Sequence, residues 1–367
     1  MIHVFRPKVR TEEILQELKP VLESGWIGLG PKTAEFERRL QAYLDVGHVV
    51  ATNSCTSALH LAIRALSLPS KAKVLTTPIT FVSTNHALLY EGLEPVFYDV
   101  DKLTGNASYE SIEFGVLNYN IKAIMVVHLG GYSADMDRIN TLAKKYNIPI
   151  IEDCAHAFGA TYKDKKVGNT NNICTWSFHA VKNMPLGEGG ALSTNNEEIA
   201  ERIRKLRWLG IDKDTISRSQ NLKYKWEYDV EEVGYKYHMS DIAATIGLVG
   251  LKHIEEDNKR REEIARFYLD NLNCILPDYD LEKRMSSFHF VPLFFENREE
   301  VYDRLVENDI HPGMHYKRND KYDCYKNCLK INKCENAQWY EDHELTLPLH
   351  LELTKDDLLK IKSVINA

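Results

Sequence analysis

A lysine next to an apolar stretch is the first residue of this sequence whose setting suggests covalent chemistry. Lys182 follows residues 176–181, and a glycine-rich stretch, residues 187–190, lies just beyond it. Desolvation lowers the pKa of an amine, and small neighbouring residues leave room for a ligand, so such a lysine can act as a nucleophile toward a carbonyl group. A surface lysine in a glycine-rich loop explains this fragment equally well.

Two acidic residues end a second apolar stretch. Glu152 and Asp153 follow residues 148–151, and His156 lies three positions beyond Asp153. A buried carboxylate is costly unless a cation or hydrogen-bond donors accompany it. In a pyridoxal-phosphate (PLP) enzyme, the protonated ring nitrogen of the cofactor is such a cation, and the acid beside it keeps the ring an electron sink. Asp153 is therefore the candidate partner of a PLP ring, and Lys182 the candidate Schiff-base lysine.

A small polar turn provides a possible phosphate site. Ser54, Cys55, Thr56 and Ser57 stand between an apolar run and an amphipathic stretch. Backbone amides and the dipole at the start of a helix bind phosphate well. A helix cap requires the same small polar residues, and on the turn alone capping is the favoured interpretation.

The elements that must position these residues alternate along residues 48–195. Short β-branched runs alternate with amphipathic stretches, which predicts a mostly parallel sheet flanked by helices. The runs are residues 49–52, 74–77, 95–98, 123–128, 148–152 and 174–178, and the helical patterns include 57–66, 84–91 and 136–146. In open sheets of this kind, ligands bind beyond the carboxyl ends of the strands. The residues after these runs are therefore predicted to share one site.

A smaller domain is predicted after the sheet. Residues 254–272 form a charged helical pattern that looks like a connector. Residues 288–294, 299–308 and 348–365 then predict a strand, a helix and a terminal helix, which is an α+β pattern. We expect a large α/β domain of residues 1–250, whose N-terminal segment could pack on the small domain, and a small α+β domain of residues 251–367.

The combination of these motifs resembles the DegT/StrS group of nucleotide-sugar aminotransferases. These enzymes have the type I fold of PLP-dependent transferases, as in aspartate aminotransferase. The matching motifs are Trp26-Ile27-Gly28, Gly30-Pro31, the small polar turn, Pro78-Ile79-Thr80-Phe81, Glu152-Asp153-Cys154-Ala155-His156, Ser177-Phe178-His179 ahead of Lys182, Gly187-Glu188-Gly189-Gly190, Met239-Ser240-Asp241 and, more faintly, His315-Tyr316. The resemblance thus covers most of the chain, and its motifs are specific in combination.

The resemblance implies three catalytic roles. Lys182 would carry PLP as a Schiff base and move the proton during transamination. Asp153 would bind the ring nitrogen. His156 occupies the position that hydrogen-bonds the phenolic oxygen of the cofactor, where the group often has glutamine or histidine.

The resemblance also implies how the rest of the cofactor is held. The Ser177 hydroxyl and the amides of Cys55 and Thr56 would bind the phosphate, and Phe81 would stack on the pyridine ring. One motif departs from the group: residues 234–239 carry Lys236 where the group has an asparagine that reaches the cofactor phosphate of a neighbouring subunit. A lysine can serve the same phosphate as a point charge.

Substrates and assembly follow from the resemblance alone. It implies transfer of an amino group from glutamate to a 3- or 4-keto deoxy sugar linked to a nucleotide, for a surface glycan or a decorated natural product. It also implies a homodimer whose active sites are completed by the partner chain. His315 and Tyr316 would face the substrate, although a structural role fits them equally well.

Composition excludes several other classes of protein. The 367 residues carry a formal net charge of -7, which argues against a nucleic-acid surface. The N-terminus lacks the apolar core of a signal peptide, and no run of about 18 apolar residues predicts a membrane span, so a cytoplasmic protein is expected. Seven cysteines then predict free thiols. Cys324, Cys328 and Cys334 could suggest a metal, but their spacing lacks the repeated pair of a zinc site, and no metal is expected.

Two other functions remain as alternatives. Another PLP enzyme acting on amino acids would share the cofactor residues, and a desulfurase would also need a reactive cysteine in a mobile loop. A non-catalytic regulatory protein that binds sugar nucleotides would have the same fold. The presence of Lys182 and Asp153 favours the transaminase over the second alternative and over related sugar dehydratases, which have histidine at the lysine position.

Overall fold

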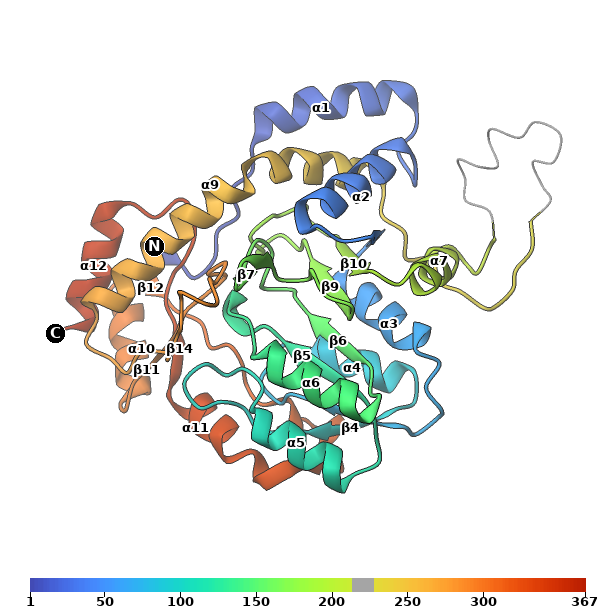
Figure 1. Ribbon diagram of the computed structural model, residues 1–367. Coiled ribbons are helices and arrows are strands. Elements are labelled where there is room, and N and C mark those ends of the chain that lie inside the picture. The colour runs from blue at the N-terminus through green and yellow to red at the C-terminus, as the bar shows by residue number, and fades with distance from the viewer. Residues whose placement is uncertain (213–227) are drawn as a thin grey trace.

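A mixed eight-stranded sheet forms the centre of the fold (Figure 1), in a computed structural model that describes residues 1–212 and 228–367. Its strands, in spatial order, are β13 (Leu329–Lys330), β4 (Glu94–Phe97), β3 (Lys73–Thr76), β5 (Ile121–Val127), β6 (Ile150–Asp153), β9 (Ile173–Ser177), β10 (Gly190–Thr194) and β2 (His48–Thr52). Strand β10 is antiparallel to both its neighbours, whereas the other pairs are parallel. The predicted mostly parallel sheet is confirmed.

Helices cover both faces of this sheet, and the strand residues alternate between them as a pleated strand requires. One face packs against α3 (Cys55–Ala65), α4 (Val82–Tyr90) and α7 (Glu197–Leu206). The opposite face packs against α2 (Pro31–Leu44), α5 (Tyr109–Asn118), α6 (Met136–Tyr146) and the start of α9 (Asp241–Asn271). On β6, Ile151 lies in the first core and Ile150 in the second. Asp153 and Glu152 therefore face opposite sides of the sheet.

The connecting helix α9 begins earlier than the sequence pattern indicated. It starts at Asp241 instead of near residue 254, and the Ser240 side chain caps it by accepting a hydrogen bond from the Ala243 amide. The buried Asp241 carboxylate in turn accepts hydrogen bonds from the amides of Gly30 and Thr33 at the start of α2. The first half of α9 is buried against α1 (Thr11–Ser24) and α2, so its pattern is apolar on several sides and the charged periodicity appears only later.

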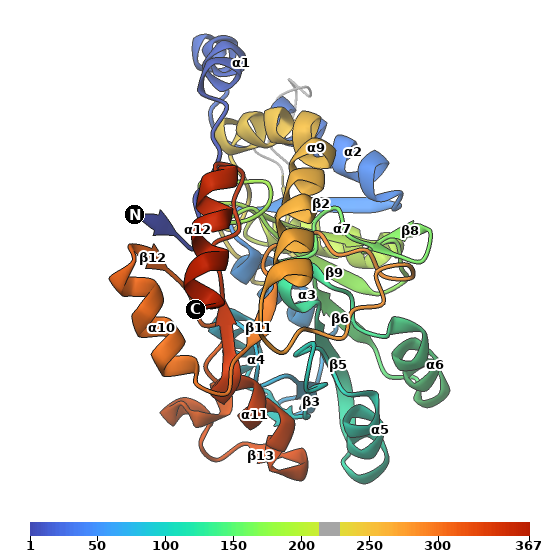
Figure 2. The ribbon, with the colours of Figure 1, turned by 90° about the vertical axis from the view of Figure 1, so that its left-hand side faces the viewer.

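The C-terminal part packs around its own core at one side of the sheet (Figure 2). Its elements are β11 (Pro292–Phe294) paired with β14 (Glu344–Thr346), β12 (Ile310–His311), α10 (Arg298–Glu307), α11 (Glu335–His343) and α12 (Lys355–Ile365). The N-terminal strand β1 (Ile2–His3) pairs in parallel with β12, so the chain start packs on this part. Strand β13 returns to the edge of the large sheet beside β4.

Two elements of the C-terminal part are shorter than expected. The strand predicted over 288–294 is regular only from Pro292, because Phe288 has a positive φ of 48° and the amide of His289 donates to Gly130 instead of a ladder partner. The terminal helix starts at Lys355 and not at residue 348, because Thr354 and Asp357 form a capping box.

The remaining elements are short. They are the hairpin β7 (Thr161–Tyr162) and β8 (Lys165–Lys166) and the 3-10 turns η1 (Leu129–Gly131), η2 (Asn319–Lys321), η3 (Asp323–Tyr325) and η4 (Ile331–Cys334).

Within residues 1–212 and 228–367, no helix combines the length and the apolar character that a membrane crossing needs. All seven cysteines are free thiols. Of the three near the C-terminus that were considered as metal ligands, Cys334 is buried, Cys328 partly buried and Cys324 exposed.

Candidate active site

A cavity of about 450 Å³ lies at the carboxyl ends of β6 and β9. Every predicted site residue except Lys236 lines it: Cys55, Thr56, Phe81, Asp153, His156, Ser177, Lys182, His315 and Tyr316. They come from strand ends, from the start of α3 and α4, and from the segment after β12. The cavity also contains residues that the sequence patterns did not single out, among them Phe5, Thr84 and His289.

Lys182 is the reactive amine of the cavity. It follows β9 in a short loop, where its amide donates to the carbonyl of His179 at 2.9 Å. The side chain is partly exposed to the cavity, yet the surrounding protein desolvates the amine and lowers its pKa to about 8. Nearby Asp153 and Cys55 oppose this shift only partly. Both the neutral and the charged amine are therefore accessible near neutral pH, as suits a nucleophile that also moves protons.

Asp153 is a buried carboxylate held by two donors. Thr84 on α4 donates its hydroxyl to one oxygen at 2.7 Å, and the amide of Ala155 donates to the other at 3.0 Å. The Thr80 hydroxyl lies 2.8 Å from that of Thr84 and extends this chain of polar groups. Burial raises the pKa of Asp153, because a charged carboxylate is poorly solvated there. A cation bound in the cavity would favour the ionised form.

His156 has one engaged and one free ring nitrogen. Its Nε2 lies 3.2 Å from the Tyr316 hydroxyl, while the buried Nδ1 has no hydrogen-bond partner among the residues that the structure describes. The ring stacks on that of His289, with centroids 4.6 Å apart, and His289 stacks in turn on Phe5. Burial and the nearby Lys182 hold the pKa of His156 well below its usual range, so the ring is neutral.

The start of α3 combines both predicted roles of the small polar turn. Ser54 caps the helix, its hydroxyl accepting from the Ser57 amide at 3.1 Å. The first bond of the helical ladder runs from the Ala58 amide to the Ser54 carbonyl, so the amides of Cys55 and Thr56 precede it and point out of the helix start. Gly190 on β10 lies directly behind, where a Cβ atom would come within 2.5 Å of the Cys55 nitrogen. The small polar turn can therefore lie this close to the strand ends, beside Ser177, only because residue 190 is a glycine.

His315 and Tyr316 both face the cavity and make structural contacts. The His315 amide donates to Glu344 at 2.8 Å, and its Nδ1 lies 2.9 Å from the Thr346 hydroxyl. Burial lowers the pKa of His315 to about 3. Tyr316 contacts His156 as described, so the pair links the C-terminal part to the strand β6 region.

Lys236 and Phe81 lie differently from the other predicted residues. The ammonium of Lys236 sits 3.7 Å from the centroid of the Trp208 ring, outside the cavity of its own chain. Its predicted contact is with a neighbouring subunit, so this role stays a prediction. Phe81 stands at the cavity rim and is 58% exposed, which leaves its ring free to stack on a ligand or to meet another chain.

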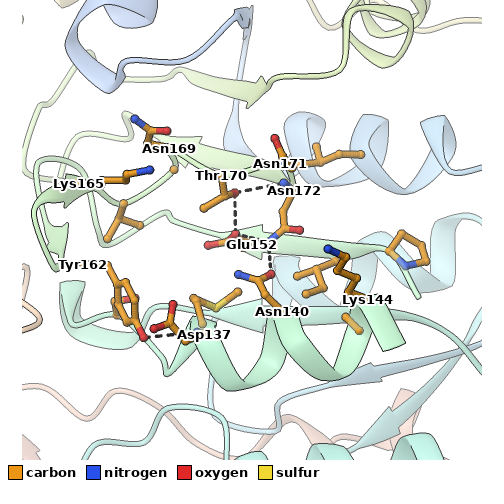
Figure 3. Close-up of a pocket in the computed structure, with 18 of the residues that line it drawn as sticks. Asp137, Asn140, Lys144, Glu152, Tyr162, Lys165, Asn169, Thr170, Asn171 and Asn172 are labelled. Atoms are coloured by element: carbon orange, nitrogen blue, oxygen red, sulfur yellow. Dashed lines mark hydrogen bonds between the residues drawn. The ribbon is translucent and has the colours of Figure 1, made fainter. Parts of the chain in front are cut away.

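A second cavity, of about 620 Å³, lies on the opposite side of β6 (Figure 3). Glu152 reaches it between α6 and residues 168–172 and accepts hydrogen bonds from Thr170 at 3.0 Å and Asn172 at 2.6 Å. Its other oxygen is 2.8 Å from Nε2 of His128, whose Nδ1 accepts from the amide of Ala134. Since these groups satisfy one another, we interpret the network as a support for β6.

A possible metal cluster belongs to the same network. His128, Glu152 and Cys154 bring ligand atoms within 4.8 Å of one another. However, both ring nitrogens of His128 and both oxygens of Glu152 are already engaged in the hydrogen bonds given above. The reactive amine, the neutral imidazole with a free nitrogen and the helix-start amides all belong to the first cavity, which is therefore the candidate active site.

Three residues of the site could not have been found from the sequence alone. Thr84 has no distinctive motif around it, and only the packing of α4 on β6 brings it to Asp153. Phe5 and His289 come from segments far apart in the chain, and nothing in their local sequence connects them with His156. For His289, the one available signal was a histidine inside a predicted apolar strand.

Comparison with known proteins gives consistent matches over nearly the whole chain. The model of the DegT/DnrJ/EryC1/StrS aminotransferase family matches residues 8–366. The UDP-4-amino-4,6-dideoxy-N-acetyl-beta-L-altrosamine transaminase of Campylobacter jejuni is 38% identical over 92% of this chain and 89% of that relative.

Solved structures agree with the sequence matches. The sugar aminotransferase CalS13 of Micromonospora echinospora superimposes with a TM-score of 0.89 at 29% identity, covering 100% of this chain and 99% of that one. Spr1654 of Streptococcus pneumoniae, solved in a PLP form, gives a TM-score of 0.89 at 28% identity, covering 100% of this chain and 98% of that one.

Proposed function

Since the chain belongs to the DegT/DnrJ/EryC1/StrS aminotransferase family and is a PLP-dependent sugar aminotransferase, we propose that it moves an amino group from glutamate to a nucleotide-linked keto-deoxy sugar. The observation that carries the proposal is the grouping of a desolvated lysine amine, a buried carboxylate and a helix start in one cavity. The product would serve the synthesis of a deoxyamino sugar.

The cavity fits PLP in the character of its polar groups. The amine of Lys182, with its pKa near 8, suits a covalent bond to an aldehyde carbon. The buried Asp153 suits a ring nitrogen that carries a proton, and the neutral imidazole of His156, which lines the cavity, suits an oxygen of the ring. The amides of Cys55 and Thr56 suit a phosphate. When bound, PLP supplies a ring that withdraws electrons from the carbon whose proton is moved.

The residues of the chain then have distinct tasks. The Lys182 amine binds the cofactor and, when released, takes and returns the proton, which its pKa near neutrality allows. Asp153, oriented by Thr84, keeps the ring nitrogen protonated. Ser177 and the amides of Cys55 and Thr56 hold the phosphate, and Phe81 covers the ring. His315 and Tyr316 border the space left for the sugar.

A homodimer is part of the proposal. Phe81 is exposed at the rim of the cavity in the single chain, and Lys236 lies outside its own cavity. Both features suit a site that a second copy completes, with Lys236 reaching the phosphate bound by its partner. A cation on a flexible stem can replace an amide donor at a dianion.

A desulfurase is not favoured by the setting of the cysteines. Among the described residues, the cysteine that lines the cavity is Cys55. Burial and the neighbouring Asp153 raise the pKa of its thiol well above the usual range. Because the thiolate is the nucleophile, a thiol with a raised pKa is a poor one.

The proposed function is tested by following the colour of the purified protein with PLP. Glutamate is expected to bleach the yellow absorption, and a nucleotide-linked 3-keto or 4-keto deoxy sugar is expected to restore it and yield the amino sugar. A panel of UDP- and dTDP-linked keto sugars identifies the acceptor. If glutamate bleaches the protein but only 2-keto acids restore the colour, the enzyme acts on amino acids and the proposed acceptor is wrong.

The low pKa of Lys182 predicts how PLP capture by the apoenzyme depends on pH. Only the neutral amine attacks an aldehyde, so with a pKa of about 8 capture is expected to be about tenfold faster at pH 9 than at pH 7 and then to level off. N-acetyl-lysine, measured in parallel, corrects for the titration of PLP itself. Capture that still rises roughly sevenfold between pH 9 and pH 10 would show an unperturbed lysine instead.

A further inference from the structure

A buried carboxyl group lies behind His315, in the C-terminal part of the chain. Glu344 on β14 is 2% exposed, and its two oxygens accept hydrogen bonds from the His315 amide at 2.8 Å and from the Thr346 hydroxyl at 2.5 Å. Both donors are neutral, so among the residues that the structure describes no cation is in hydrogen-bond contact with this carboxyl group. A buried carboxylate without such a cation readily takes up a proton.

The Thr346 hydroxyl connects this carboxyl group to the imidazole of His315. Thr346 is fully buried, and its oxygen lies 2.9 Å from Nδ1 of His315. The backbone fixes the arrangement, because the amides of Gly313 and Thr346 each donate to the other's carbonyl at 2.8 Å. His315 lines the cavity of the candidate active site, and its Nε2 has no partner in the described part of the chain. Since Nε2 is not one of the buried polar atoms that lack a partner, a ligand can reach it.

The chain from Glu344 to His315 has two arrangements that differ by one proton, because a hydroxyl group carries one hydrogen. When Glu344 is ionised, Thr346 donates to it, Nδ1 of His315 donates to Thr346, and Nε2 is an acceptor. When Glu344 is protonated, it donates to Thr346, Thr346 donates to Nδ1, and the ring hydrogen is on Nε2. The buried groups are paired in both arrangements, so neither carries the penalty of an unsatisfied hydrogen bond.

Electrostatics place the additional proton on the carboxyl group and not on the ring. Burial raises the pKa of Glu344 to about 8, although its two donors and the more distant Arg298 oppose this shift. Burial and the charge of Lys182 lower the pKa of His315 to about 3, so the ring passes a proton on without remaining an imidazolium. The other titratable groups that act on the pair are neutral near pH 7, because desolvation lowers the pKa of the histidines and raises that of the tyrosines: His156, His289, Tyr279, Tyr316 and Tyr340.

We propose that His315, Thr346 and Glu344 form a proton relay: Nε2 of His315 takes a proton from a group bound in the cavity, the Nδ1 proton moves to the Thr346 oxygen, and the Thr346 proton moves to Glu344. One proton enters, one carboxylate is neutralised, and the ring ends neutral. In the proposed function, on which this role rests, the proton is the one that the ammonium group of the amino donor must lose before its nitrogen can attack. Lys182 is not a free base at that moment, because its amine is bound to the cofactor.

The first test uses the apoenzyme labelled with ¹⁵N-histidine and needs neither cofactor nor substrate. The signals of His315 are assigned by their loss in His315→Gln. Between about pH 6 and about pH 10, the ring hydrogen is expected to move from Nε2 to Nδ1, with a midpoint near pH 8 and no stage at which both nitrogens are protonated. A ring that keeps one tautomer over this range, or that becomes an imidazolium, overturns the proposal.

Three variants identify the group that drives this switch of tautomer. In Glu344→Gln the amide nitrogen can donate to the hydroxyl at every pH, so the ring hydrogen is expected to stay on Nε2. Lys182→Ala is expected to keep the switch, which shows that the charge of the lysine is not its cause. Glu341→Gln is the matched control, because the Glu341 carboxyl group also accepts from a backbone amide, that of Arg318, but does not line the cavity. A switch that persists in Glu344→Gln or disappears in Lys182→Ala overturns the proposal.

The second test measures the single-turnover reaction of the PLP-loaded protein with the amino donor as a function of pH. Glu344→Gln is expected to slow it about 10²-fold near pH 7, and the loss should shrink at higher pH, where more of the donor arrives as a neutral amine. Thr346→Val is expected to behave in the same way, whereas Thr346→Ser keeps a hydroxyl group and should restore most of the rate. A loss of equal size at every pH means a structural role and overturns the relay.

The tests also separate this proposal from the proposed function. If Glu344→Gln abolishes the switch in the apoenzyme but leaves the donor reaction unchanged, the relay has no role in the reaction and is refuted, while amination of a keto sugar by the wild-type protein would still support the proposed function. If both effects of Glu344→Gln are found but no keto sugar is aminated, the relay is supported and only the proposed acceptor fails.

Discussion

Replacing Lys182 by alanine is expected to abolish the yellow PLP complex and to lower amino transfer by about 10⁴-fold or more, because both covalent capture and proton movement depend on this amine. The fold should persist. At pH 7 the wild-type amine is largely charged in a setting that disfavours its charge, so its removal is expected to leave the thermal midpoint of the apoenzyme unchanged or higher. Visible spectra, single-turnover rates and thermal melts measure the three effects.

Lys165→Ala provides the matched control for the lysine. Lys165 lines the second cavity, on the far side of β6, and has no place in the proposed chemistry. Its replacement is expected to leave colour, rate and thermal midpoint unchanged. A Lys182→Ala protein that still formed the yellow complex would show that another amine binds the cofactor.

Replacing Asp153 by asparagine is expected to retain PLP but slow the proton shift by roughly 10² to 10⁴-fold, because the ring nitrogen loses the charge that keeps it protonated. The hydrogen bond from Thr84 can persist, since asparagine also has an acceptor oxygen. Single-turnover kinetics with glutamate separate this step from binding. Full activity in Asp153→Asn would remove the residue from the mechanism.

Glu152→Gln is the control at the neighbouring residue. In contrast to Asp153→Asn, it is expected to lower stability and to leave the rate of the proton shift unchanged. Glu152 points away from the candidate active site, and its two oxygens receive hydrogen bonds from His128, Thr170 and Asn172. Glutamine offers one acceptor oxygen where three donors converge, so the free energy of unfolding is expected to fall by about 1–3 kcal/mol. Chemical denaturation of the apoenzyme measures it. The rate of the proton shift in the folded variant should stay close to that of wild type.

Much of the central sheet and of its flanking helices could be predicted from the sequence because their signals are local. The six predicted strand runs of the central sheet are apolar and short, and Ser54 caps the start of α3. Strand β13, with two exposed residues, has no such signal. Lys182 was ambiguous by itself. It became specific only together with Asp153, since two weak motifs in the right order are much rarer than either alone.

The sequence-based predictions of secondary structure were wrong where tertiary contacts outweigh the local pattern of apolar and polar residues. The first half of α9 is apolar on several sides because α1 and α2 cover it, so its start at Asp241 was missed. Phe288 leaves the strand pattern because of its backbone conformation, which its side-chain type does not reveal. The contact between Tyr316 and His156 joins residues 160 positions apart, and no periodicity in the sequence reports such a pair.

The alternation of side chains on β6 has a consequence for how the gene can change. Glu152 and Asp153 are consecutive, yet one supports the strand from behind while the other faces the candidate active site. A single codon gained or lost between Ile150 and Glu152 would exchange their faces, placing Glu152 in the candidate active site and Asp153 in the supporting network. Length variation among descendants of this gene should therefore accumulate in loops and be absent from this strand.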